Sequence, residues 1–152
     1  TGLWQSCDVY AARTRKRSDG VMGDFVKYDE GSFCEAGNFG RETAIAHNAW
    51  HPRVTYFEDF GMYLMSCVRV TPGGKLLVDD VMQLRTSTDL IHWSEPVVVT
   101  QEGKEWGYHY VAMVPDDAKN APNIVTGKTF SVLGNYNGTN VIRHPAQWVK
   151  KA

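Results

Sequence analysis

The sequence predicts an all-β protein. Short apolar or alternating segments, bounded by Gly, Pro, Asn and Asp, follow one another along nearly the whole chain. Residues 62–70 are almost continuously apolar, which is typical of a strand buried on both faces. No stretch has the apolar period of a long amphipathic helix, and only residues 145–151 are compatible with a single helical turn.

The clearest unit lies in the middle of the chain. Four strands are predicted there in succession, at residues 53–57, 62–70, 76–86 and 97–99. The turns between them carry Gly and Pro, so neighbouring strands should run antiparallel. Four antiparallel strands make one blade of a β-propeller, and we assign a full blade to residues 50–100.

Partial copies of this unit flank it. A further blade is predicted at residues 106–143 and a blade remnant at residues 1–35. The segment from Arg85 to Trp93 has an echo between Arg13 and Tyr28: each has a strand end, a Ser/Asp turn and a following aromatic residue. The predicted fold is therefore an all-β β-propeller over residues 1–152 with about two to two and a half four-stranded blades. A β-sandwich gives a similar strand pattern, and the repeat at blade spacing favours the propeller.

Composition limits the class of partner. The net charge of -1 gives no electrostatic reason to expect nucleic acid or an anionic membrane. The cysteines, Cys7, Cys34 and Cys67, are odd in number and form no CxxC pair, so we interpret them as buried thiols rather than zinc ligands or a disulfide framework. The five Trp residues suit a sugar-binding surface, whose rings cover the apolar face of a pyranose, and would equally suit an enlarged core.

A family resemblance rests on three motifs. Residues 87–96 (STDLIHWSEP) resemble the S-x-D-L-x-x-W-x-x-P turn of five-bladed propeller glycosidases, namely family 43 glycoside hydrolases and their relatives in families 32, 62 and 117. Residues 49–56, followed by 62–65, are similar to the opening of a blade in these proteins, and residues 31–42 to the loop that precedes it. The resemblance covers residues 9–143 and only the later blades.

This resemblance implies the C-terminal half of a glycoside hydrolase that acts on plant or microbial polysaccharide, secreted or periplasmic, with a cytoplasmic location left open. A five-bladed propeller of this family is roughly twice as long as this chain. The partners implied are an oligosaccharide or polysaccharide, and either a missing N-terminal propeller half or a second copy of the chain. The family's catalytic carboxylates lie on the first blades, so we expect them outside this chain. A non-catalytic carbohydrate-binding propeller and a purely structural fragment are the alternatives.

Candidate site residues begin at the first strand of the full blade. His51 opens this strand, where propeller side chains point into the central cavity, and can bind sugar hydroxyls or anchor the loop. Trp50 beside it is either a stacking platform or packing between blades. Glu42 in the preceding loop is the weak catalytic candidate, and otherwise a solvated loop residue.

The next blade offers matching candidates. Tyr108, His109 and Tyr110 precede its first strand and are predicted to contact the sugar. The resemblance implies that a late-blade His helps to hold a metal or water cluster on the axis, which makes His109 the metal candidate, with Ca²⁺ as the ion. Arg143 and Asn135 are predicted to face the ligand from the last strands.

The Ser/Asp turn itself is interpreted as structural. The Asp89 carboxylate is expected to accept backbone N–H bonds, and Trp93 to pack over the hairpin. His92 is expected to be exposed to solvent.

Overall fold

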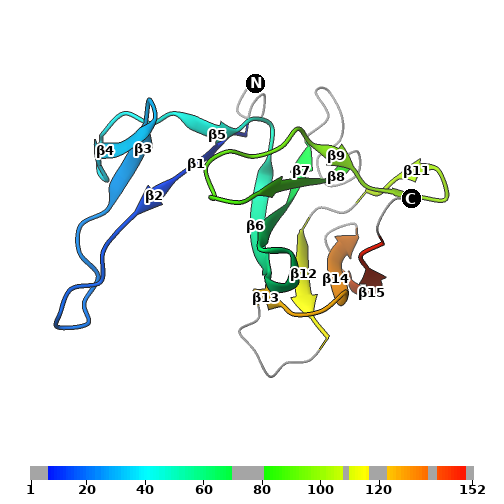
Figure 1. Cartoon of the computed structure of the whole chain (residues 1–152). Coiled ribbons are helices and arrows are strands. Elements are labelled where there is room, and N and C mark those ends of the chain that lie inside the picture. The colour runs from blue at the N-terminus through cyan, green and yellow to red at the C-terminus, as the bar shows by residue number, and fades with distance from the viewer. Residues whose placement is uncertain (1–6, 70–80, 108–109, 117–122, 137–139, 150–152) are drawn as a thin grey trace.

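A computed structural model describes residues 7–69, 81–107, 110–116, 123–136 and 140–149. Its regular structure is β throughout these residues, apart from the 3₁₀ turn η1 (Glu58–Phe60). The prediction of an all-β protein is confirmed. Three main sheets follow one another along the chain, and Figure 1 places the central sheet between the other two.

The central sheet contains the predicted four-stranded antiparallel unit. Its antiparallel strands are β6 (Trp50–Phe57), β7 (Met62–Arg69), β8 (Val81–Ser87) and β9 (Val97–Val98), paired in chain order. This order confirms the four predicted strands over the described residues, while residue 70 of the second predicted strand and residues 76–80 of the third lie outside them. The sequence pattern did not predict the fifth strand, β13 (Ile124–Val125), which pairs in parallel with the end of β6.

The strand β7 is covered on both faces, as its apolar run predicts. Leu64 and Val68 point into the main core, where the Phe57 ring meets the Phe130 ring edge-on at 5.2 Å. Met65 and Cys67 point to the opposite face. That face is covered by Ala46 and Ala49 from the segment before β6, and by Val9 and Trp93. The central sheet is thus packed between two layers.

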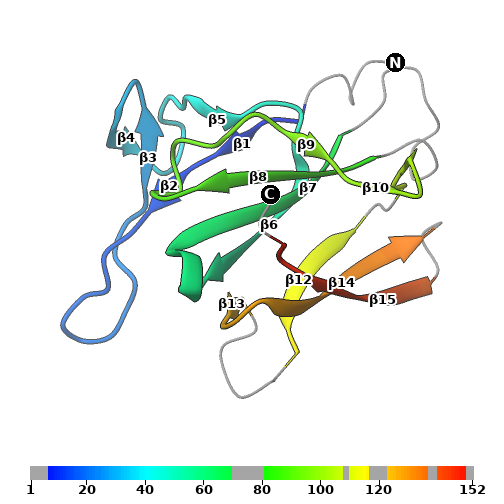
Figure 2. The same ribbon diagram turned by 45° about the vertical axis from the view of Figure 1, so that its right-hand side comes forward.

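The C-terminal sheet consists of β12 (Val111–Pro115), β14 (Thr129–Tyr136) and β15 (Asn140–Gln147). Its apolar face closes the main core against the central sheet (Figure 2). The predicted helical turn at residues 145–151 is wrong up to Gln147, because Pro145 and Ala146 pair with Ser131 and Phe130 as part of a strand. Pairing with β14 overrides the weak local preference.

The N-terminal region forms a three-stranded sheet and a two-stranded one. The former contains β2 (Ala12–Arg13), β3 (Val26–Asp29) and β4 (Ser32–Ala36), and the latter pairs β1 (Val9–Tyr10) with β5 (Ala44–Ala46). The prediction of a loop over residues 31–42 is therefore wrong at β4, where exposed and half-buried residues alternate along a hairpin. A small hairpin, β10 (Thr100–Gln101) and β11 (Lys104–Glu105), follows the central sheet.

Two buried hydroxyl groups join the central and C-terminal sheets. Thr55 on β6 donates a hydrogen bond to the Met113 carbonyl at 3.0 Å, and Ser66 on β7 donates one to the Val111 carbonyl at 3.3 Å. These carbonyls point away from β14, on the edge of β12 that has no strand partner among the described residues. An unpaired buried carbonyl is costly, so the two hydroxyls satisfy this edge where the sheets meet.

The Ser/Asp turn has the predicted structural role. The Asp89 carboxylate accepts the backbone N–H groups of Ile91 and His92 at 2.9 and 2.8 Å. His92 is exposed, and its Nδ1 lies 2.6 Å from Asp89 Oδ2. These hydrogen bonds, led by the one to the His92 side chain, lower the pKa of Asp89. Trp93 packs over the central sheet.

Among the described residues, no helix has the length and apolar character needed to cross a membrane. The described sheets follow one another without closing into a ring (Figures 1 and 2). Cys67 is buried as predicted, and burial raises its pKa to about 11, against the opposing effect of Arg85. Cys34 is exposed and Cys7 is only half-buried, so the prediction of buried thiols is wrong for Cys34 and holds fully for Cys67 alone.

Candidate ligand-binding rim

A β-bulge sets the position of His51. The pairing of β6 with β7 slips between Trp50 and Arg53, so that one extra residue is inserted into β6. His51 takes a positive φ of 49°, and Pro52 next to it has no N–H to lose from the ladder. Bulges re-aim side chains, and histidine is one of the few residues that tolerates this backbone region. The His51 ring is therefore turned out of the regular alternation of β6.

The His51 ring lies between two aromatic rings. It stacks on the Trp50 ring, with ring centres 4.2 Å apart. The centre of the Tyr110 ring, at the start of β12, is 4.5 Å from the centre of the His51 ring. Tyr110 immediately precedes β12, where its carbonyl accepts a hydrogen bond from Asn135 N at 2.9 Å. Its ring is half exposed, whereas Trp50 packs partly against the main core. The structure thus brings the starts of β6 and β12 together in one aromatic cluster.

A hollow of about 290 Å³ adjoins this cluster. Its polar lining comes from Arg53, Tyr110 and Asn135, and its apolar lining includes Leu133 and Val141. Asn135 Oδ1 is buried and has no hydrogen-bond partner among the described residues, so it can accept a bond from a bound hydroxyl group or a water. The volume lies at the lower limit of small-molecule sites, about 300–1,000 Å³.

Arg143 lies on the same face of the C-terminal sheet as this hollow, directly across from Leu133 in register. Its Nε donates to the buried Ser131 hydroxyl at 2.7 Å, and its Nη2 lies 3.2 Å from Asp116 Oδ1. Ser131 in turn donates to Asp116 at 2.6 Å, and this bond is the main cause of the lowered pKa of Asp116. Arg143 is thus held beside the hollow by a closed network, with its side chain 63% exposed.

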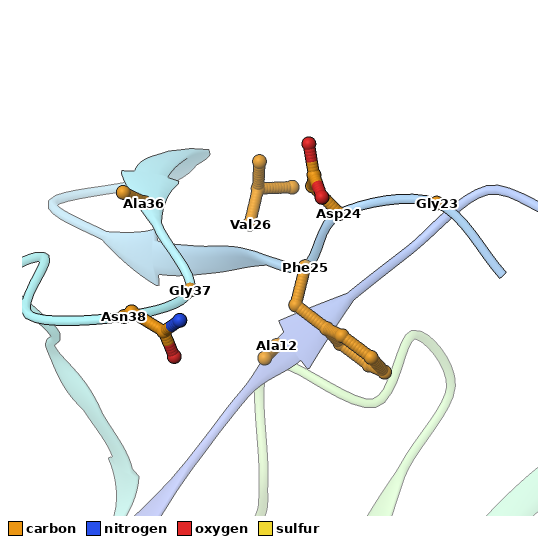
Figure 3. A pocket seen from close by; sticks show the side chains of 8 residues that line it. All are labelled: Ala12, Gly23, Asp24, Phe25, Val26, Ala36, Gly37 and Asn38. Carbon is orange, nitrogen blue, oxygen red and sulfur yellow. The ribbon is translucent and has the colours of Figure 1, made fainter.

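The N-terminal sheet has a larger hollow, of about 700 Å³ (Figure 3). Phe25, with its ring half exposed, Asp24 and Asn38 contribute to its lining. A Cβ on Gly37 would lie 2.7 Å from the Phe25 carbonyl oxygen, so only glycine allows the end of β4 to approach the start of β3 this closely. Sequence reasoning did not predict this hollow.

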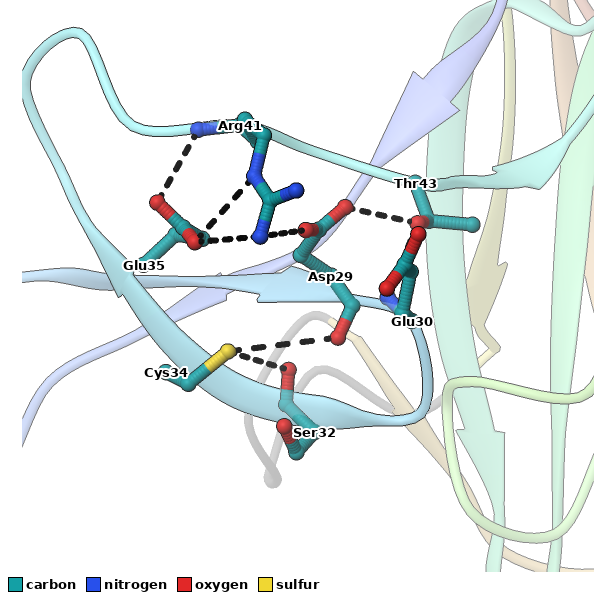
Figure 4. Close-up of polar contacts among 7 residues, drawn as sticks. All are labelled: Asp29, Glu30, Ser32, Cys34, Glu35, Arg41 and Thr43. Atoms are coloured by element: carbon teal, nitrogen blue, oxygen red, sulfur yellow. Dashed lines mark hydrogen bonds and ion pairs between the residues drawn. The ribbon is translucent and has the colours of Figure 1, made fainter.

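Glu42 lies on the N-terminal region. Its carboxylate pairs with Lys27 Nζ at 2.8 Å, and it is absent from the lining of the hollow beside His51. The residues on either side of it are fixed to β3 by the buried Asp29 (Figure 4): Arg41 pairs with Asp29 at 3.4 Å, and Thr43 donates to it at 2.9 Å. This network directs the Glu42 segment along the β3–β4 hairpin.

The described residues supply no acid–base pair at the rim. No carboxylate lines the hollow beside Tyr110, and no group of three metal-ligating side chains occurs in the part of the chain that the structure describes. Tyr108 and His109, with the metal role predicted for His109, lie outside the described residues. The described rim residues can bind a ligand but supply no pair of catalytic carboxylates. The binding groups are aromatic rings, one side-chain amide and guanidinium groups.

Sequence reasoning missed Arg53 as a rim residue. The available signal was its position in the strand, because Arg53 shares a face with Thr55 and Phe57 and is the charged end of that apolar stripe. The bulge next to it determines whether that end reaches a hollow, and a bulge leaves no sequence pattern beyond Pro52.

The chain matches no protein-family model, and no curated protein or solved structure shows significant similarity to it.

Proposed function

We propose that this chain is the C-terminal half of a β-propeller glycoside hydrolase of the family 43 type, secreted or periplasmic, that acts on plant or microbial polysaccharide. The observation that carries the proposal is the cluster of Trp50, His51 and Tyr110 at the starts of β6 and β12, beside the hollow with Arg53 and Asn135. In a propeller, the first strands of neighbouring blades line the central cavity. An aromatic ring there stacks on a pyranose, and the polar groups bind its hydroxyls.

Hydrolysis needs two carboxyl groups, which the described residues of this rim do not supply. One protonates the leaving oxygen; the other acts as base at about 6.5–9.5 Å from it, or as nucleophile at about 5–5.5 Å. In the proposal these groups come from the missing blades, and the present chain forms the wall of a sugar subsite. His109 remains the proposed ligand for a Ca²⁺ ion on the axis.

The distribution of exposed apolar side chains supports an open-ended propeller. Most of those exposed by half or more lie in the N-terminal region or the C-terminal part of the chain. They are Val21, Met22, Phe25 and Phe39 in the former and Val141 and Val149 in the latter; Val97 in the central sheet is the exception. The central sheet, in contrast, is covered on both faces. Large exposed apolar patches are unusual on soluble monomers, so the end sheets are proposed to pack on further blades. We favour a missing N-terminal half over a second copy as their source.

Light scattering coupled to size-exclusion chromatography tests this part of the proposal. The isolated chain should associate or aggregate, and mixing it with the complementing half should give a single defined complex. A monodisperse 17.1 kDa species that unfolds cooperatively would overturn the half-propeller.

A non-catalytic carbohydrate-binding propeller is the second candidate. The observation that favours it is that, among the described residues, no carboxylate lines the hollow at the rim. Turnover of a polysaccharide by the complemented assembly would decide for the hydrolase. Binding without turnover by that same assembly would decide for the binding module.

Calorimetric titration with neutral xylo-, arabino- and cello-oligosaccharides tests the rim itself. Tyr110→Ala and His51→Asn should each weaken binding by about 1–3 kcal/mol, the range for a lost stacking ring or a lost buried polar partner. Asn is chosen for position 51 because it tolerates the positive φ, so the backbone is retained. Phe39→Ala is the matched control, since this ring is fully exposed and absent from the rim. Unchanged binding in both rim variants would refute the rim assignment.

A further inference from the structure

The densest positive charge in the chain lies on the N-terminal hairpin, far in sequence from the rim. Four of the 16 Lys and Arg residues fall within residues 13–17, and no acidic residue separates them. The hairpin that follows is well hydrogen-bonded. Gly23 N donates to the Arg15 carbonyl at 2.9 Å, Arg17 N donates to Val21 O at 2.8 Å, and Thr14 Oγ1 donates to Gly23 O at 2.7 Å. The cations are therefore presented on an ordered backbone.

Three of these cations line one recess. It has a volume of about 370 Å³, and its lining includes Arg13, Arg15, Arg17 and Phe33. Thr14 also lines the recess, whereas Lys16 is not among its lining residues. We call this the arginine recess.

The guanidinium groups are only partly neutralised by the protein. Arg17 pairs with Asp19 at 3.2 Å on the exposed surface, and Arg13 lies over the Phe33 ring at 4.2 Å. The Arg15 side chain forms no hydrogen bond or ion pair with a described residue, and Asp24 is the one carboxylate in the lining of the recess. Three guanidinium groups against the two carboxylates of Asp19 and Asp24 leave a surplus of one positive charge that an anionic ligand can satisfy.

The arginine recess adjoins the hollow of Figure 3. Gly23, Asp24 and Val26 line both, so the two share a wall, and the half-exposed Phe25 ring lies on the far side of it. A ligand that extends from one to the other would meet guanidinium groups first and an aromatic ring next. That sequence of contacts suits a charged sugar followed by a stacked one.

We propose that the arginine recess binds the carboxylate or sulfate group of an acidic oligosaccharide, at a site separate from the rim. This inference rests on the proposed carbohydrate function and specifies the substrate class as acidic. A glycan is favoured over nucleic acid because the site is a recess of sugar size beside an aromatic ring.

The test compares ligands that differ only in charge. Oligogalacturonate and its fully methyl-esterified form have the same sugar backbone, and the acid should bind at least roughly tenfold more tightly, because the ester removes the anionic partner. Its affinity should fall as ionic strength rises from about 0.05 to about 0.5 M. A sulfated heparin oligosaccharide, measured in parallel, distinguishes a sulfate from a carboxylate as the preferred group.

Matched variants locate the binding. Arg15→Gln and Arg13→Gln should each weaken oligogalacturonate binding by roughly fivefold, and Lys104→Gln, an exposed cation on β11, should leave it unchanged. The Arg15 side chain forms no hydrogen bond or ion pair with a described residue, so its variant removes the charge without breaking a polar contact of the protein. Circular dichroism verifies that each variant is folded.

Three outcomes would overturn the inference: equal binding of acid and ester, full binding by Arg15→Gln, or tighter binding of a single-stranded DNA oligonucleotide than of the oligosaccharide at equal salt. The proposed function fails separately. If Tyr110→Ala loses neutral-sugar binding but still binds oligogalacturonate, the rim and the arginine recess are two separate sites. The absence of binding to any glycan would refute both.

Discussion

The hydroxyl of Thr55 should hold the central and C-terminal sheets together. The residue is 2% exposed, and its hydroxyl donates to the Met113 carbonyl at 3.0 Å on the otherwise unpaired edge of β12. Thr55→Val keeps the shape and the β-branch and removes only this donor. A net hydrogen bond contributes about 0.5–1.5 kcal/mol, and a buried acceptor left unpaired costs about 1–3 kcal/mol. We therefore expect the variant to lose about 1–3 kcal/mol of unfolding free energy.

Urea denaturation followed by tryptophan fluorescence measures this loss. Thr100→Val, at an exposed position on β10, is the control and should change stability by less than about 0.5 kcal/mol. Ser66→Ala should cost less than Thr55→Val, because its bond to the Val111 carbonyl is longer at 3.3 Å. The reasoning is refuted if Thr55→Val unfolds at the same urea concentration as Thr100→Val.

The remaining predictions concern three separate parts of the chain. The depressed pKa of Asp89 means that its stabilisation is complete above the unfolded-state value of about 3.9 and is lost as pH falls towards the folded-state pKa. Thermal melts should thus show that the difference in Tm between the unmodified chain and Asp89→Asn becomes smaller in acid. A difference in Tm that stays constant with pH would contradict this. With a pKa of about 11, Cys67 has roughly one thiolate in a thousand at pH 8, so iodoacetamide should label the exposed Cys34 first, as read by peptide mass spectrometry. Glu42→Gln should remove only the half-exposed pair with Lys27, a loss below about 1 kcal/mol, and a change in oligosaccharide affinity would show that Glu42 does act at the rim.

The central sheet was predictable because its signals are local. The apolar run that became β7 and the turn residues on either side define strands without reference to the rest of the chain. The Asp89 turn was equally predictable, because a carboxylate two and three residues before backbone N–H groups forms the same hydrogen bonds in many contexts.

The features that were missed depend on partners distant in sequence. The two residues of β13 have no pattern of their own and become a strand only against Tyr56 and Phe57. Pro145 is extended because Ser131 lies opposite it in β14. For the site, residue types at the starts of β6 and β12 were informative, whereas the direction of His51 depends on a bulge that only the pairing with β7 reveals.

The parallel pairing of β13 with β6 affects how the molecule can come apart. Between β12 and β14 the chain forms β13, which is the edge strand of the central sheet. Val125 in β13 is fully buried beside Phe57. The C-terminal hairpin therefore cannot open by itself, because pulling it away would also strip a strand from the neighbouring sheet. The backbone amides of the central and C-terminal sheets should then exchange their hydrogens at one common slow rate, because the two sheets open as a single cooperative unit. The N-terminal hairpin formed by β2 and β3 has no such link to the central sheet among the described residues, so its amides can exchange independently.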